Sequence, residues 1–158
     1  MNLFYYPAKV LEIPCEVVVD FNDELNLLLD GMKEVMLKHN GLGLSANQVG
    51  VSKRVMIVKN NKGEIYEFIN PVVIDVADAD SLPEGCLSFP GIFLDIIRPT
   101  SVMFQYQDRT GEVKKAMAEG IEARCFLHEM DHLKGKTMLD SVNRDMRKTV
   151  KSKMKKRK

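Results

Sequence analysis

The chain has 158 residues, 45% of them hydrophobic and 28% charged, and its formal net charge is +1. This composition excludes a disordered chain, and the lack of an 18-residue apolar run excludes a membrane-spanning helix. Cys15, Cys86 and Cys125 are too few and too scattered for a disulfide framework, and the first residues lack the layout of a signal peptide. We therefore expect one domain in the reducing cytoplasm, without membrane contact.

The small net charge conceals a basic C-terminal segment. Residues 141–158 carry nine Lys or Arg and one acid, which leaves 14 basic and 21 acidic side chains in residues 1–140. We predict a folded domain at 1–140 and a basic tail at 141–158 that is helical or frayed. Clustered cations favour contact with the phosphates of ribosomal RNA, and a solvated helix without a partner is the alternative.

The first predicted element is an amphipathic helix within residues 20–39. Asp20 or Asn22 is the candidate N-cap, and Asn40 followed by Gly41 is a stop signal. The apolar residues at helical spacing are Leu25, Leu28, Leu29, Met32, Val35 and Met36.

Strands and a second helix follow. Residues 54–60 and 64–70 predict one hairpin, and residues 102–107 and 112–118 predict another. Residues 119–134 predict a late helix that ends at Gly135. This order indicates an α+β fold, with antiparallel β-sheets packed around the C-terminal helix and an N-terminal amphipathic helix.

The late helix contains FLHEMDHLKG at 126–135, with two of the three histidines. His128 and His132 are four residues apart, so both can reach one metal ion from the same face of a helix. Glu129 lies about 100° further round, beside such an ion, in the position of a general base. This H-E-x-x-H spacing is typical of metallohydrolases. The alternative is two surface or core histidines without a metal.

A catalytic site of this kind needs a third ligand. Cys86 lies in PEGCLSFPG at 83–91, which we predict to be a loop because two prolines and Gly85 interrupt a regular strand. Cys125 is the competing candidate, but ligands from one helix alone would leave little room for a substrate. We assign packing to Cys125, and a core position or a surface thiol to Cys15.

Three segments together resemble the signature motifs of the peptide deformylase family. They are GLGLSANQ at 41–48, EGCLS at 84–88 and HEMDHLKG at 128–135. The similarity extends to VLEIPCEVV at 10–18, INP at 69–71 and GIEAR at 120–124, so it covers roughly residues 1–140.

The resemblance implies a reaction and a cofactor. Cys86, His128 and His132 would bind one divalent metal, ferrous iron natively, with zinc, nickel or cobalt as replacements. A metal-bound hydroxide would hydrolyse the N-formyl group from the formylmethionine of new polypeptides and release formate, with Glu129 as general acid and base. Gln48, through its side chain, and Leu87, through its backbone N–H, would stabilise the oxyanion.

The resemblance also implies substrate contacts and supporting residues. The nascent formyl-Met peptide would pair with the backbone around Gly43 and with Gly85. Arg98 and Asp131 would form a salt bridge that joins the ligand region to the late helix. The methionine side chain would enter a pocket made by Leu42, Leu82, Ile121, Cys125 and the aliphatic stem of Arg124.

Two positions depart from the usual family pattern. Leu127 stands where glutamine is usual, directly before the first histidine, and Ser45 stands where alanine is usual. Two alternatives to a monomeric deformylase remain at this point. One is a metallopeptidase, although no histidine follows His132; the other is a ribosome-associated relative without activity, or with weak activity. The expected location is the cytoplasm of a bacterium, or of the bacterial host if the source is a virus.

Overall fold

The computed structural model describes residues 1–157 and contains three α-helices and seven strands among them. Helix α1 spans Asp23–Lys38, α2 spans Gly120–Leu133 and α3 spans Arg144–Lys156. Short 3-10 helices lie at Lys9–Glu12, Ala46–Val49 and Met138–Ser141. In residues 1–157, no helix has both the length and the apolar content that crossing a membrane requires.

The strands form two antiparallel sheets. One has the order β1–β2–β3–β6–β7, with β1 at Gly43–Ser45, β2 at Val55–Lys59, β3 at Ile65–Ala77, β6 at Ser101–Gln107 and β7 at Val113–Glu119. The other contains β4 at Asp80–Cys86 and β5 at Phe89–Arg98. Both hairpins expected from the sequence are present, and β3 extends beyond the prediction to Ala77.

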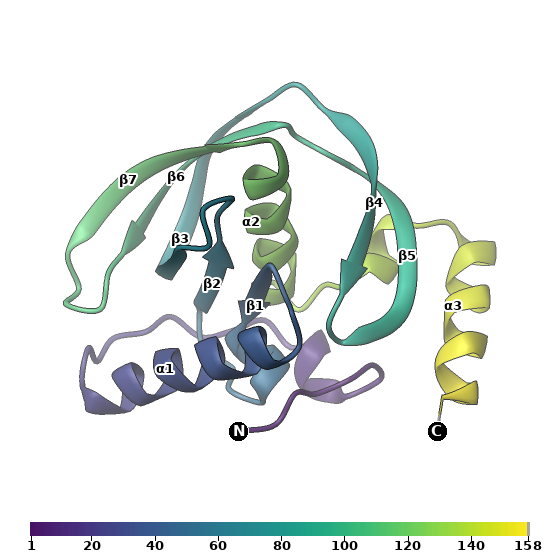
Figure 1. Ribbon diagram of the computed structural model, residues 1–158, viewed down its shortest axis with the longest axis horizontal. Helices are drawn as coiled ribbons and strands as arrows, with labels where there is room; N and C mark the ends of the chain where they lie inside the picture. The colour runs from purple at the N-terminus through teal and green to yellow at the C-terminus, as the bar shows by residue number, and fades with distance from the viewer. Residues whose placement is uncertain (158) are drawn as a thin grey trace.

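Helix α2 lies between the two sheets (Figure 1). One of its faces buries Ala123, Phe126, Met130 and Leu133 against residues of β2, β3 and β6. The other directs polar side chains toward the β4–β5 hairpin. Helix α1 packs its apolar face against residues of β1 and β2, with Asn22 as N-cap. A helix held between two sheets is thus the scaffold of the site.

The prediction of a loop at 83–91 was wrong. Strand β4 continues through Pro83 to Cys86, and β5 begins at Phe89. Pro83 pairs with Asp95, and it is tolerated because a two-stranded sheet leaves the other side of each strand unpaired. The register shifts between Gly85 and Cys86. This irregularity ends the strand and re-aims the cysteine.

The basic segment forms α3 from Arg144, with Asn143 as N-cap. Val150 and Met154 are buried against apolar side chains of β5, so the helix is packed on the outer side of the hairpin (Figure 1). Its other side chains are exposed.

Candidate active site

Helix α2 carries His128, Glu129 and His132, and all three are buried. The two imidazole rings lie 5.0 Å apart between centroids, as the four-residue spacing predicts. Burial raises the pKa of Glu129 to about 7, against the opposing effect of the charges on His128 and Arg98. Burial, together with the charge on His128, holds the pKa of His132 well below its usual value. A neutral imidazole at His132 can bind a metal ion.

Cys86 completes a cluster with these histidines. One ligand atom from each of Cys86, His128 and His132 lies within 4.8 Å of the others. The Cys86 Sγ atom is 3.3 Å from His132 Nε2. Cys125 lines the same cavity outside this cluster, and burial, followed by the charge on Glu129, raises the pKa of its thiol to about 12. The donor set of one sulfur and two nitrogens fits a divalent transition metal, with a coordination position left for water.

Glu84 is a site residue that the motif analysis missed. Its carboxylate lies 2.8 Å from His128 Nδ1 and accepts hydrogen bonds from Arg98 Nε and Nη2 at 2.7 and 3.0 Å. Burial opposes ionisation of Glu84, but the hydrogen bonds from His128 and Arg98 outweigh it and lower its pKa to about 2. A proton held on Nδ1 leaves Nε2 of His128 free for a metal. Glu84 opens the motif EGCLS, but its inward direction follows from strand β4, which was not predicted.

Two arginines connect β4, β5 and α2. Arg98 Nη1 lies 2.7 Å from Asp131 Oδ2, which is the salt bridge expected from the sequence. Arg124 Nη1 donates to Glu84 Oε2 at 2.6 Å and to the Ile96 carbonyl oxygen at 2.8 Å. Only the stem of Arg124 was expected to have a role, at the pocket wall, and these polar contacts were not predicted from the sequence.

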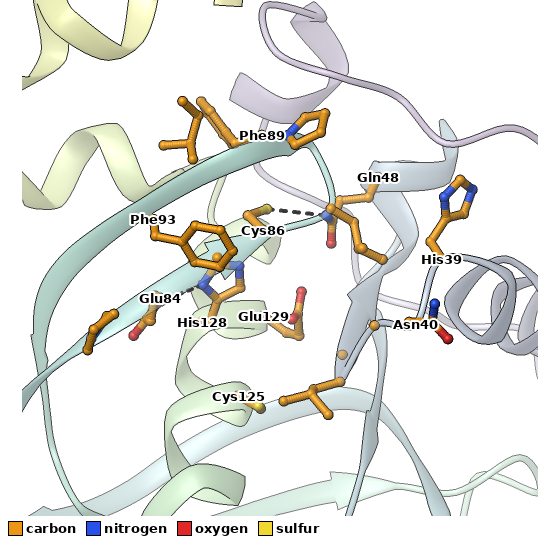
Figure 2. Close-up of a pocket in the computed structure, with 18 of the residues that line it drawn as sticks. His39, Asn40, Gln48, Glu84, Cys86, Phe89, Phe93, Cys125, His128 and Glu129 are labelled. Atoms are coloured by element: carbon orange, nitrogen blue, oxygen red, sulfur yellow. Dashed lines mark hydrogen bonds and ion pairs between the residues drawn. The ribbon is translucent and has the colours of Figure 1, made fainter. Parts of the chain in front are cut away.

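Gln48 faces Cys86 from the first motif (Figure 2). Its Oε1 accepts hydrogen bonds from the Ser45 backbone N–H at 3.0 Å and from Ser45 Oγ at 2.9 Å. These contacts turn Nε2 toward Ser88 Oγ at 3.1 Å and toward Cys86 Sγ at 3.6 Å. Gln48 is 1% exposed, so a surface role is excluded.

A cavity of about 520 Å³ opens over the cluster. Of the seven residues assigned to substrate, six line it: Leu42, Gly43, Gly85, Ile121, Arg124 and Cys125. Leu82 is not part of this wall; it lies on β4, at a position 38% exposed. The sequence analysis did not foresee the wall positions of His39, Asn40 and Phe93 (Figure 2).

The comparisons with known proteins agree on one family. A family model described as polypeptide deformylase matches residues 1–148. The chain belongs to this family. Peptide deformylase 1 of Bacillus anthracis is 41% identical in an alignment 146 positions long, which covers 91% of this chain and 93% of that protein. The crystal structure of the Ehrlichia chaffeensis peptide deformylase in complex with actinonin aligns with a TM-score of 0.96 at 35% identity, over 100% of this chain and 97% of that one.

A plant relative is also similar. The chloroplastic peptide deformylase 1B of Oryza sativa is 38% identical in an alignment 160 positions long, which covers 98% of this chain and 60% of that protein. Leu127 and Ser45, which depart from the deformylase pattern, have different surroundings in the structure. Leu127 packs against the apolar cluster between α2 and the five-stranded sheet. Ser45 is fully buried and contacts Gln48, so its hydroxyl helps to orient this amide.

Proposed function

We propose that this protein hydrolyses the N-formyl group from the N-terminal formylmethionine of nascent polypeptides and releases formate. The observation that carries the proposal is the convergence of Cys86, His128 and His132 with Glu129 and Gln48 at one cavity of a deformylase-family chain. Formylated chains arise where translation starts with formylmethionine. We therefore assign the protein to such a compartment, the bacterial cytoplasm in the first instance.

A divalent metal fits the ligands, and we infer ferrous iron, with zinc, nickel or cobalt as replacements. Cys86 Sγ, a nitrogen of His132 and Nε2 of His128 would hold it. When bound, such an ion acts as a Lewis acid and makes water nucleophilic near neutral pH. Glu84 supports this role because its contact with His128 Nδ1 keeps the ring in one orientation.

Side chains and backbone groups of the protein carry out proton transfer and stabilise the oxyanion. Glu129 takes the proton of the attacking water and returns it to the leaving amine, for which a pKa of about 7 is suitable near neutral pH. Gln48 Nε2 and the Leu87 backbone N–H donate hydrogen bonds to the oxyanion that forms from the formyl group. Each donor contributes roughly 3 kcal/mol in enzymes of this type.

The substrate contacts follow from the cavity. The methionine side chain lies against Leu42, Ile121 and Cys125, which are wall residues with apolar surface. The peptide backbone extends along the main chain of Gly43 and Gly85, which both line the cavity.

The first prediction is that Glu129→Ala removes formate release but retains the metal. We expect kcat to fall by roughly a hundredfold or more, because general acid–base catalysis contributes 10²–10⁴-fold. The measurement is formate release from formyl-Met-Ala by protein loaded with iron without oxygen, beside zinc-loaded protein and with metal content determined in parallel. Lys62→Ala, in an exposed turn, is the control. Unchanged turnover of Glu129→Ala would reject this base, and an inactive wild type in both metal forms would reject the function.

A further inference from the structure

Gly43 lies in strand β1 directly against the side chain of Glu129. A Cβ atom built on Gly43 would lie 2.6 Å from Glu129 Oε2, 3.1 Å from Cγ and 3.2 Å from Cδ. Ordinary van der Waals contact begins at 3.4 Å, so the carboxylate oxygen would have to retreat by about 0.8 Å. Any side chain at position 43 therefore competes with Glu129 for the same space.

The backbone at Gly43 does not itself require glycine. Six glycines have positive φ values, namely Gly50, Gly63, Gly91, Gly111, Gly120 and Gly135. Gly43 is not among them, and it pairs with Val58 in the regular antiparallel ladder of β1 and β2. An alanine can adopt this extended backbone without strain. What glycine provides at position 43 is space, not conformational freedom.

The position of the Glu129 carboxylate depends on packing. Its Oε1 atom is buried and has no hydrogen-bond partner within residues 1–157. In Figure 2 the carboxylate lies between the His128 ring and the backbone segment that leads to Gln48. The adjacent ligand His128, by contrast, is held by Glu84. A small change in the wall formed by β1 is thus passed directly to the side chain of Glu129, whose atoms are the nearest to the added Cβ.

We propose that Gly43 is a positioning residue, whose missing side chain forms the seat that holds the Glu129 carboxylate at the reacting water. This inference rests on the proposed function. It also changes the role expected for Gly43 from the sequence, which was close approach of the substrate backbone. The two roles separate kinetically, because a displaced base lowers kcat, whereas an obstructed peptide raises KM.

The test begins with Gly43→Ala in the metal-loaded protein. We expect kcat for formate release from formyl-Met-Ala to fall roughly a hundredfold, since misplacement by about 1 Å has this effect, while KM changes by less than about twofold. Metal content remains at the wild-type value, because the three atoms nearest to the added Cβ all belong to Glu129 and none to a ligand. A rise in KM with unchanged kcat would assign Gly43 to substrate approach and overturn the proposal.

A second variant tests whether the effect acts through Glu129. Aspartate is shorter by one methylene, so Glu129→Asp withdraws the carboxylate from the added Cβ. Combined with Gly43→Ala, it should leave kcat at or above the value of Gly43→Ala alone, although Glu129→Asp lowers kcat in the wild-type background. If the fold-losses in kcat of the two single variants multiply in the double variant, the two substitutions act independently, and the proposal that Gly43 positions Glu129 is contradicted.

Gly31→Ala is the matched control. Its added Cβ would also meet the end of a flexible side chain, at 2.8 Å from Met1 Cε, but far from the cavity in helix α1. We expect kcat, KM and Tm of Gly31→Ala to stay close to wild type.

Stability gives a further test. If Gly43→Ala lowers Tm, the double variant must restore Tm, because the clash is with the same carboxylate; a Tm that stays low would refute the proposal. If the wild-type protein releases no formate, the proposed function is rejected. If the wild type is active and Gly43→Ala retains its full kcat, only the positioning role of Gly43 is rejected.

Discussion

At the scale of single residues, Glu84 has three ionisable side chains as partners. It contacts Arg98, Arg124 and His128, and it is 6% exposed. A buried carboxylate is costly unless its oxygens are paired, and here both oxygens are. The partners come from β5 and α2, so one side chain orients a ligand and fixes the strand to the helix.

Glu84→Gln tests this role. The amide is neutral and loses the charge-assisted bonds to His128 and both arginines, so we expect metal affinity to fall by roughly 10–100-fold. Competition with a chelator, followed by metal analysis, measures the change. Asp95→Asn is the control, because Asp95 is an exposed acid on the paired strand. Equal metal retention by Glu84→Gln and wild type would contradict the role.

At the scale of elements, α3 differs from a free basic tail. Val150 and Met154 cover apolar residues of the β4–β5 hairpin, which also carries Cys86. Deleting residues 141–158 would expose this cluster, so a deletion would combine loss of stability with loss of positive charge. Substitutions on the exposed face of α3 remove charge without exposing the cluster.

We predict that replacing Lys148, Lys151 and Lys155 together with glutamine weakens co-sedimentation with ribosomes. These side chains are exposed, so removing three charges reduces attraction to RNA phosphates while the buried face stays intact. Sedimentation at low and moderate salt measures the effect, and an unchanged Tm confirms the fold. Equal sedimentation of variant and wild type would reject ribosomal RNA as the partner of α3.

At the scale of the whole molecule, Arg109 joins parts of the chain that are distant in sequence. Its guanidinium contacts Asp30 of α1 at 2.6 Å and Glu67 of β3 at 2.7 Å, and Lys33 lies 2.7 Å from the same carboxylate. Burial opposes ionisation of Glu67, but hydrogen bonds from Arg109 and Lys33 outweigh it and lower its pKa. This cluster connects α1 to the five-stranded sheet.

The lowered pKa makes part of the stability dependent on pH. A carboxylate with a depressed folded pKa stabilises the protein above its unfolded pKa, about 4.3, and this contribution is lost as the pH falls through the folded pKa. Glu67→Gln should therefore lower the free energy of unfolding by about 1–2 kcal/mol at pH 7. We expect the difference from wild type to shrink below about pH 4. Urea unfolding at pH 7, 5 and 3.5 tests this, with the exposed Glu112→Gln as control. A difference that stays constant with pH would contradict the mechanism.

Much of the site could be predicted because its ligands follow from local geometry. His128 and His132 share a face in any α-helix, and Glu129 must lie beside them. Cys86 was already a candidate ligand from its place in PEGCLSFPG, and the resemblance supported it and added Gln48. These two residues are 38 positions apart and come together only in the fold. The β4–β5 strands were missed because Pro83, Gly85 and Pro90 suggest a loop. A two-stranded sheet tolerates such residues because one edge of each strand has no neighbouring strand to bond.

The sequence by itself determined helices α1 and α2, the main hairpins and the metal-binding spacing, because periodicity and i, i+4 geometry act over a few residues. Tertiary structure alone decided which polar groups are buried and what they contact. Glu84 beneath His128 and Gly43 against Glu129 depend on how β4 and β1 pack on α2. Such contacts join segments 40 to 90 residues apart, and no local pattern encodes the distance between them.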